Sequence, residues 1–264
     1  MELSVIITHY KTPGLLDLCI ESIKAHIRNI KYEIIVVDSN SEETTQDFLK
    51  ENYPEVTIIP FKKNVGYSKV VNAGLIRAKG NYILLLNADI VVLEKSVSEM
   101  LEYIREHPHV GIVGPRLLDF VGNIQSSCFS FPKLRTILAR RTSFGKTSFG
   151  KRILSEFITN SFTADSPIKT DWLQGSAMMV RKKAVQKVGL WDERFFMYFE
   201  DTDWCRRFWK SGYEVIYLPA AKMAHYYHRA SKKWGALLDI FLNKRARIHI
   251  VSAIKYFWKY RHDN

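Results

Sequence analysis

The stretch YILLLNADIVV, residues 82–92, reads as a buried strand that contains polar side chains near its end. A continuous apolar run of this kind is consistent with a strand covered on both faces of a sheet. Asn87 and Asp89 interrupt the run. Because a buried carboxylate is costly without a partner, Asp89 is expected to meet a ligand or a matching protein group.

The residues around this stretch alternate between strand and helix patterns. Strand patterns cover residues 3–10, 33–40 and 56–61, and helical spacing covers residues 15–27, 44–53 and 67–79. This alternation predicts an α/β fold, with a mostly parallel, Rossmann-like central sheet flanked by helices on both faces. Ligands of such sheets bind beyond the carboxyl ends of the strands.

Polar residues gather at those predicted strand ends, namely Thr8, His9 and Tyr10, then Asp38, Ser39 and Asn40, and finally Asn87 and Asp89. Each has an ordinary alternative role, since Asp38 can cap the next helix and Asp89 can cap a turn. Two carboxylates on one edge favour a binding site instead. No Walker pattern and no Gly-x-Gly-x-x-Gly is present, so we expect a carboxylate-bound divalent cation to hold a diphosphate.

Composition limits the class of protein. The 264 residues, 47% of them hydrophobic, are enough for one large α/β domain with or without a tail. The start MELSVIITHY reads as a strand and not as a signal peptide, and no apolar run predicts a membrane span. Three scattered cysteines, Cys19, Cys128 and Cys205, favour a reduced, cytoplasmic setting. The net charge of +12 favours an anionic partner such as a nucleotide, nucleic acid or lipid.

Four segments resemble the successive nucleotide-sugar-binding motifs of family-2 glycosyltransferases: SVIITHYK, EIIVVDSNS, NVGYSKVVNAGL and YILLLNADIVV. That family has the GT-A fold, and the resemblance covers roughly residues 3 to 230. In the family, the residue matching Asp38 binds the pyrimidine base. The resemblance implies that the donor is bound by Thr8, Tyr10, Asp38, Asn64, Gly66, Asn72, Asn87 and Asp89.

Asn87-Ala88-Asp89 corresponds to the family's Asp-x-Asp motif, which binds the metal and the diphosphate. This chain has Asn at the first position, as many rhamnosyltransferase-like members do. The resemblance therefore implies that Asp89 ligates Mn²⁺ or Mg²⁺ and that Asn87 bonds to the ribose or diphosphate. It also implies a histidine that closes the metal site. His225 matches that position and His228 is the alternative, although a lone histidine is more often structural.

The second half is densest between residues 171 and 204. We predict a Gly-containing strand at 172–180, a short helix closed by Gly189, and an aromatic-rich loop that leads into a helix starting at Glu200-Asp201. A further strand follows at 213–219, with His225 beyond a turn. Free amides at a helix start favour acidic side chains.

That preference explains one carboxylate but not three within four residues, Glu200, Asp201 and Asp203. Like charges this close raise one another's pKa, which suits a general base. The resemblance implies that Asp201 is the base, with Glu200 as acceptor ligand or support. It places Trp172 and Gly175 on the acceptor side.

The segment GLWDERFFMYFEDTDW looks most like the rhamnosyltransferase-type branch, which uses dTDP-rhamnose. The expected protein is an inverting, metal-dependent glycosyltransferase of the hexosyltransferase type. It would transfer a sugar from a nucleoside-diphosphate donor to a hydroxyl of a saccharide or polyprenyl-linked saccharide, in cell-surface polysaccharide synthesis.

Two basic segments complete the chain. Residues 133–152 contain seven Lys or Arg and no acidic residue, which predicts a mobile loop. Residues 231–264 read as a basic amphipathic helical tail. This tail either packs on the domain or lies on an anionic membrane on the inner face, with Trp234, Phe241, Phe257 and Trp258 at the interface.

The predicted organisation is a GT-A domain over residues 1–230, followed by the tail. Its nucleotide-sugar half is 1–115 and its acceptor half is 116–230.

A UDP-sugar transferase of the same fold, for hexose or N-acetylhexosamine, is the nearest alternative. A nucleotidyltransferase would show a basic Gly-rich signature near the first strand. A non-catalytic nucleic-acid or membrane-binding protein fits the charge, but carboxylates at three element ends argue against it, so no nucleic acid is expected.

Overall fold

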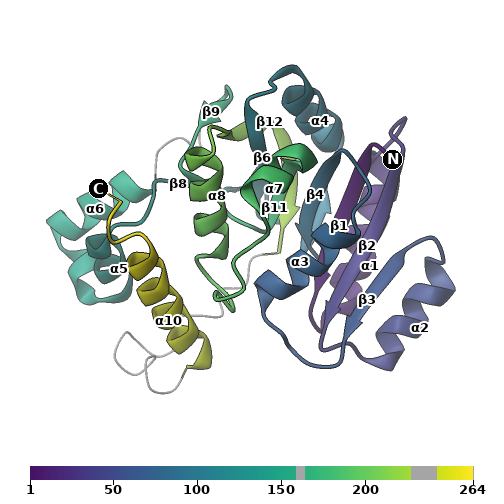
Figure 1. Cartoon of the computed structure of the whole chain (residues 1–264), viewed down its shortest axis with the longest axis horizontal. Coiled ribbons are helices and arrows are strands. Elements are labelled where there is room, and N and C mark those ends of the chain that lie inside the picture. The colour runs from purple at the N-terminus through teal and green to yellow at the C-terminus, as the bar shows by residue number, and fades with distance from the viewer. Residues whose placement is uncertain (159–163, 227–242, 264) are drawn as a thin grey trace.

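The computed structural model describes residues 1–158, 164–226 and 243–263. Its main sheet has the strand order β3-β2-β1-β4-β11-β6-β12-β5, with β7 added to β6 and β9 added to β12 (Figure 1). The strands are β1 (Leu3–His9), β2 (Tyr32–Ser39), β3 (Thr57–Phe61), β4 (Tyr82–Asn87), β5 (Ile90–Val92), β6 (Val110–Leu118), β7 (Ile124–Gln125), β9 (Ile168–Lys169), β11 (Ala177–Arg181) and β12 (Glu214–His225). A separate pair consists of β8 (Cys128–Phe129) and β10 (Trp172–Leu173).

The first four strands of the order are parallel to one another, and β6 is parallel to β12. Antiparallel β11 lies between β4 and β6, and antiparallel β5 forms the far edge on β12. The sheet is therefore mixed, with its parallel part built by the N-terminal strands. The predicted α/β class with a central, mostly parallel sheet is confirmed.

Helices cover both faces of this sheet. Alternate residues of β1 point to opposite faces: Val5 shares a buried cluster with Leu16, while Ile6 shares another with Val71. The first face bears α1 (Pro13–His26), α2 (Glu43–Asn52) and α4 (Ser96–Glu106), and the second bears α3 (Tyr67–Arg77), α7 (Lys182–Val188) and α8 (Glu200–Lys210). Close packing on the second face depends on Gly74, where a Cβ would lie 2.4 Å from Ile6 Cγ2.

Residues 82–92 form two strands rather than one. The central strand β4 ends at Asn87, and a turn at Ala88 and Asp89 leads to β5 at the edge of the sheet. There β5 pairs with the end of β12, with Ile90 opposite His225. The turn therefore delivers Asp89 to the neighbourhood of His225, although 135 residues of chain separate Ile90 from His225.

Two other predicted strands also differ. The segment 172–180 is divided into β10 and β11 by residues 174–176. The strand predicted at 213–219 extends to His225 as β12, with a register shift between Leu218 and Lys222. Pro219 lies in the shifted part and has no amide hydrogen to donate, which accounts for the local break in pairing.

The prediction of a mobile loop at 133–152 was wrong. This segment forms α5 (Leu134–Arg141), the 3₁₀ turn η1 (Ser143–Lys146) and α6 (Ser148–Phe157). Thr147 caps α6 by accepting a hydrogen bond from the amide of Gly150. Ile153 and Phe157 are buried at helical spacing, and Phe157 stacks on Phe129. The cations whose side chains are described, Lys133, Arg135, Arg140, Lys146, Lys151 and Arg152, are all exposed, and their number conceals the apolar spacing in the sequence.

The C-terminal helix α10 (Lys244–Lys259) packs one face against residues 190–199, the aromatic loop before α8. Its buried members include Ala253 and Tyr256, which share a cluster with Phe195 and Phe199. Figure 1 shows α10 beside α5 and α6, at the end of the molecule opposite α2. The predicted tail is thus helical in this part, whereas Trp234 and Phe241 lie outside the described residues.

Candidate active site

Three neighbouring strands bring predicted donor residues to one edge of the sheet. The register pairs His9 of β1 with Asp38 of β2, and Thr8 of β1 with Asn87 of β4. All four residues lie at the carboxyl ends of parallel strands, where α/β sheets bind ligands. The structure therefore places these sequence-predicted residues side by side.

Asp38 is held by a histidine. His9 Nδ1 lies 2.8 Å from Asp38 Oδ1, and both side chains are buried. The amide of Thr12 donates to His9 Nε2 at 2.9 Å, so the ring is the neutral tautomer that donates from Nδ1 to Asp38. Asp38 Oδ2 is buried without a hydrogen-bond partner among the described residues. This oxygen can accept a hydrogen bond from a ligand N–H group.

Tyr67 lies between Asn87 and the second half of the chain. Asn87 Oδ1 accepts hydrogen bonds from Thr8 Oγ1 at 2.9 Å and Tyr67 Oη at 2.7 Å. The phenol of Tyr67 also lies 2.8 Å from the carbonyl oxygen of Gly175, a residue predicted to face the acceptor. Burial raises the pKa of Tyr67, and the charges of Glu200, Asp201 and Asp89 raise it further.

Asp89 faces His225. His225 Nε2 lies 3.7 Å from Asp89 Oδ1, which is buried and has no hydrogen-bond partner among the described residues. Burial raises the pKa of Asp89 to about 6 and lowers the pKa of His225 to about 4. A buried carboxylate oxygen beside a neutral imidazole is a donor set that suits a divalent cation.

Gln125 orients this imidazole. Its Oε1 lies 2.9 Å from His225 Nδ1, and its Nε2 donates to the backbone oxygen of His225 at 3.0 Å. An amide oxygen accepts only from a protonated Nδ1, so the lone pair of the ring is on Nε2, the nitrogen that faces Asp89.

Glu200 and Asp201 begin α8 with different surroundings. Asp201 accepts hydrogen bonds from the amides of Gly175 at 3.1 Å and Thr202 at 2.7 Å. Glu200 Oε2 is buried without a partner among the described residues. Burial raises the pKa of both side chains. The charge of Asp201 raises that of Glu200 further, whereas the amide hydrogen bonds act against the increase at Asp201.

The third carboxylate, Asp203, is paired with other side chains inside the protein. Its carboxylate is paired with Arg207 at 2.9 Å and Lys259 at 2.5 Å, and it accepts a hydrogen bond from Tyr260 Oη at 2.8 Å. These contacts attach α10 to α8. Of the three carboxylates singled out in the sequence, Asp203 therefore stands apart from the pair at the edge.

The loop before α3 approaches the aromatic loop closely. Asn64 Oδ1 accepts from the amide of Gly66, whose φ of +90° favours glycine. A Cβ at Gly66 would lie 2.7 Å from Phe196 Cδ2.

The side chain of Asn72 is occupied inside the protein. Its NH₂ group donates to the backbone oxygen of Trp191, and its oxygen accepts from the amide of Trp191, both at 2.9 Å. Tyr10 is 45% exposed at the end of β1.

Of the two residues predicted for the acceptor side, Gly175 lies against Asp201, whereas Trp172 packs on Phe129 and Ser130. Gly175 has little room for a side chain, since a Cβ would lie 3.0 Å from Trp191 Cη2 and 3.3 Å from Asp201 Cβ. Trp172 stacks on Phe129 at 4.7 Å between ring centroids, and its indole donates to the oxygen of Ser130.

Sequence reasoning missed three residues that the geometry singles out, His9, Tyr67 and Gln125. His9 lies at a strand end that the sequence did mark as polar, and the strand register explains its role. Tyr67 is within the NVGYS segment. Gln125 is 100 residues from His225, and no local pattern points to it. His228 lies outside the described residues.

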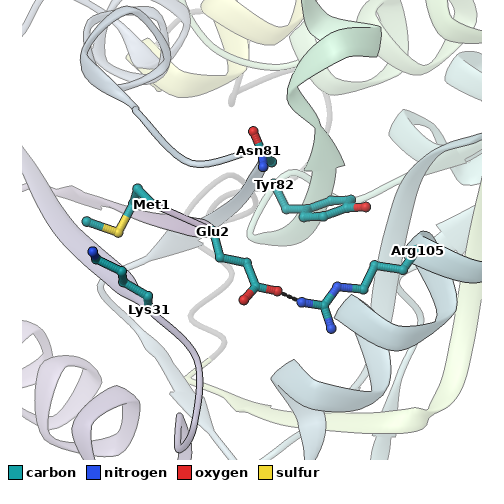
Figure 2. A pocket seen from close by; sticks show the side chains of 6 residues that line it. All are labelled: Met1, Glu2, Lys31, Asn81, Tyr82 and Arg105. Atoms are coloured by element: carbon teal, nitrogen blue, oxygen red, sulfur yellow. Dashed lines mark ion pairs between the residues drawn. The ribbon is translucent and has the colours of Figure 1, made fainter.

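A pocket of about 450 Å³ lies at the opposite edge of the sheet (Figure 2). Met1, Glu2 and Tyr82 line it at the amino ends of β1 and β4, and Glu2 pairs with Arg105 across it. None of the predicted site residues lines this pocket. Because ligands of α/β sheets bind at the carboxyl ends, we regard the other edge as the candidate active site.

Within the described residues, no group of three or more His, Cys, Asp or Glu side chains is arranged to hold a metal ion. A cation at Asp89 and His225 would therefore need further oxygen ligands from a diphosphate or water, as Mg²⁺ and Mn²⁺ commonly do. The side chains of Cys19, Cys128 and Cys205 are buried and form no disulfide. In the same part of the chain, no helix has the length and apolar character needed to cross a membrane.

This mixed sheet, covered by helices on both faces, has the GT-A fold of glycosyltransferases. The family model for glycosyl transferase family 2 matches residues 4–188, and the chain belongs to that family. The predictions of the family and of the enzyme class are thereby confirmed.

The similar curated proteins include rhamnosyltransferases. The N-acetylglucosaminyl-diphospho-decaprenol L-rhamnosyltransferase of Mycobacterium tuberculosis is 27% identical over 209 residues, 73% of this chain and 66% of that protein. Rhamnosyltransferase WbbL of Escherichia coli is 28% identical over 185 residues, 70% of this chain and 64% of that protein. The matches thus span slightly less than two thirds of these relatives.

Solved structures show the same fold. GalNAc-T7 with UDP, GalNAc and Mn²⁺ superposes with a TM-score of 0.66 at 17% identity, covering 86% of this chain and 44% of that chain. The mannosyltransferase PcManGT from Pyrobaculum calidifontis, in complex with GDP-Man and Mn²⁺, has a TM-score of 0.60 at 16% identity, covering 97% and 64%.

Proposed function

We propose that this protein is an inverting, metal-dependent glycosyltransferase that uses a nucleoside-diphosphate sugar, with dTDP-rhamnose favoured and a UDP-sugar as the alternative. The observation that supports this most directly is the pair of unpartnered buried carboxylate oxygens at one edge, Asp38 Oδ2 and Asp89 Oδ1. Each can be completed by a different part of such a donor. The rhamnosyltransferase relatives favour rhamnose as the sugar.

Asp38 is the proposed base-binding residue. Thymine and uracil both present an N3–H donor, which matches an acceptor oxygen held in place by His9. Cytosine has no hydrogen at N3 and would leave the Asp38 oxygen unsatisfied. Thr8, Tyr10, Asn64 and Gly66 would complete the donor side. Asn72 would act on the donor only by supporting the aromatic loop, because Trp191 occupies its amide.

Asp89 and His225 are the proposed ligands of Mn²⁺ or Mg²⁺, and the Mn²⁺ complexes of two proteins with this fold are in keeping with such a site. When bound, the cation would neutralise the charge that develops on the leaving diphosphate. Asn87 keeps its oxygen toward Thr8 and Tyr67, so its NH₂ group is available to donate to a diphosphate or ribose oxygen.

Asp201 is the proposed base. The acceptor hydroxyl oxygen bonds to the anomeric carbon as the bond to the diphosphate oxygen breaks, and the hydroxyl proton passes to the Asp201 carboxylate. The raised pKa of Asp201 makes it a stronger base than an exposed carboxylate. Glu200 shares the raised pKa and would bind the acceptor or hold the released proton.

The proposed acceptor is a saccharide, in particular one linked to a polyprenyl diphosphate, with Trp172 and Gly175 on its side of the site. The solvent-facing side of α10 exposes Val251, Ile254 and Trp258 among cations. Such a side suits contact with the anionic surface on the inner face of a membrane. Salt should then release the protein from anionic vesicles. Synthesis of a cell-surface polysaccharide is the process that such an acceptor implies.

Thermal stabilisation tests the donor class. UDP or dTDP with Mn²⁺ should raise the melting temperature, and the same nucleotides in EDTA should raise it much less. A panel of nucleotide sugars, scored by hydrolysis, then identifies the donor. Stabilisation by an oligonucleotide and not by the nucleotides would contradict the proposal.

A further inference from the structure

A second pocket lies between α10 and Phe196 of the aromatic loop. Its volume is about 330 Å³, and it is lined by Phe196, Lys244, Arg247, Ile248, Val251, Ser252 and Lys255. Small-ligand pockets in proteins have volumes of about 300–1,000 Å³, so this one can hold a small group. Its lining combines apolar side chains with three cations and contains no acidic residue.

Two of these cations have no counter-charge within the part of the chain that the structure describes. The side chains of Lys244 and Arg247 make no hydrogen bond or ion pair with residues 1–158, 164–226 or 243–263. Lys255 donates to the backbone oxygen of Arg194 at 2.6 Å, which fixes its ammonium group at the rim. Three neighbouring cations repel one another, and an anion placed among them relieves that repulsion.

The pocket adjoins the candidate active site. The oxygen of Phe196 accepts a 2.7 Å hydrogen bond from the amide of Tyr67, beside the donor loop at Gly66. On the other side, Ser252 of α10 donates to the oxygen of Met197 at 2.8 Å. Phe196 precedes Glu200 by four residues, so their Cα atoms are at most about 14 Å apart.

An apolar row leads away from the pocket along α10. Val251 lines the pocket and is 49% exposed, and Ile254 and Trp258 are 64% and 62% exposed. Their spacing of three and four residues places them on one side of the helix. A ligand with an anionic group in the pocket and a hydrocarbon chain would cover this row.

We propose that this pocket binds the phosphate groups of a prenyl-phosphate-linked acceptor, with the start of the prenyl chain along Val251, Ile254 and Trp258. The inference rests on the proposed function, because it treats the ligand as the acceptor. The headgroup of a bilayer lipid has similar chemistry. The acceptor is favoured because Phe196 joins the pocket to both the donor loop and Glu200-Asp201, where an attached sugar must react.

Calorimetry with farnesyl diphosphate as the probe, in EDTA and without nucleotide, tests the pocket separately from the metal site. The double variant Lys244→Ala/Arg247→Ala should bind it at least about tenfold more weakly, as expected for loss of charge-assisted hydrogen bonds. Arg245→Ala is the matched control, since Arg245 is an exposed cation of the same helix outside the pocket. This control should bind like the wild type.

Farnesol and inorganic pyrophosphate should each bind more weakly than farnesyl diphosphate, because farnesol lacks the phosphate groups and pyrophosphate lacks the hydrocarbon chain. Equal affinity of the double variant and the control for farnesyl diphosphate would overturn the inference. So would a double variant that loses binding only to phosphatidylglycerol vesicles, which would make the pocket a lipid headgroup site. Mn²⁺-dependent nucleotide binding, measured in the same variants, reports on the proposed function independently.

Discussion

Two regions of this molecule bury carboxylates in opposite ways. At the proposed donor edge, formed by the carboxyl ends of β1, β2 and β4, Asp38 Oδ2 and Asp89 Oδ1 are buried without hydrogen-bond partners among the described residues. Where α10 meets α8, the carboxylate of Asp203 is buried with Arg207, Lys259 and Tyr260 around it. A buried polar group without a partner destabilises a fold, so its presence indicates a ligand that completes it, whereas a fully paired group contributes to the fold itself.

The largest expected effect concerns Asp89, whose buried oxygen makes no hydrogen bond to the described residues. Asp89→Asn should abolish transfer and Mn²⁺-dependent nucleotide binding, because the amide cannot replace a charged ligand. Its melting temperature in EDTA should not fall, since Asp89 Oδ1 has no hydrogen bond to lose. Calorimetry of UDP or dTDP with Mn²⁺ measures the first result and a thermal melt the second. Unchanged metal-dependent binding would remove Asp89 from the site.

Asp201→Asn should have the next largest effect. Loss of a positioned base typically lowers kcat by about a hundred- to ten-thousand-fold. Nucleotide affinity should stay near that of the wild type, because the donor is proposed to contact Asp38 and the metal site. Turnover with saturating acceptor and calorimetry with the nucleotide separate the two quantities.

Glu200→Gln is the matched variant for this test, since Glu200 is the neighbouring carboxylate with a raised pKa. If Asp201→Asn turns over within a few-fold of the wild type and Glu200→Gln does not, the roles of the two residues are exchanged. A collapse of donor affinity in Asp201→Asn would instead place Asp201 in the nucleotide site.

Gln125 offers an intermediate test. Gln125→Leu removes the acceptor that fixes the His225 ring, and loss of such a supporting contact typically lowers metal affinity by about ten- to a hundredfold. The Mn²⁺ concentration that half-saturates nucleotide binding should rise accordingly. Gln125→Glu keeps an acceptor for His225 Nδ1 but loses the donor to the backbone oxygen of His225, so it should recover part of the affinity. Equal Mn²⁺ requirements in all three proteins would show that His225 is not a ligand.

The donor edge could be largely predicted from sequence because its information is local. Strands and helices alternate at short spacing, and the polar residues Thr8, Asp38 and Asn87 stand at the ends of apolar runs. Parallel pairing then brings these ends together. The pairing of His9 with Asp38 needed the register of the two strands as well.

The other region could not be predicted in the same way. Asp201 and Asp203 are the same residue type two positions apart, yet a helix turns about 200° over two residues, so the two side chains face different surroundings. Arg207, four residues on in the same helix, is a local partner of Asp203, but its other two partners, Lys259 and Tyr260, lie more than 50 residues along the chain. The helices within 133–152 were hidden for a different reason, since their surface cations dominate the composition.

Lys259→Met should have the smallest effect on activity. It tests the region where the carboxylate of Asp203 is paired. Lys259 Nζ lies 2.5 Å from Asp203 Oδ1 and 2.8 Å from Asp192 Oδ2, and it links α10 to α8 and to the aromatic loop. Its loss leaves Arg207 and Tyr260 on Asp203, so we expect a decrease of about 2 kcal/mol in the free energy of unfolding. Nucleotide binding should be unchanged. Urea unfolding measures the decrease, with Arg245→Met as the control on the same helix.

The pH dependence sharpens this last test. Burial alone would raise the pKa of Asp192, yet hydrogen bonds from Arg194 and Lys259 outweigh it and hold the pKa below its usual range. A lowered pKa in the folded state contributes stability above the unfolded value of about 3.9, and that stability is lost as the pH falls. The stability difference between wild type and Lys259→Met should therefore be largest near pH 7 and shrink as the pH falls below about 4. A difference that is constant over this range would mean that Lys259 acts through the packing of its hydrocarbon stem and not through its charge.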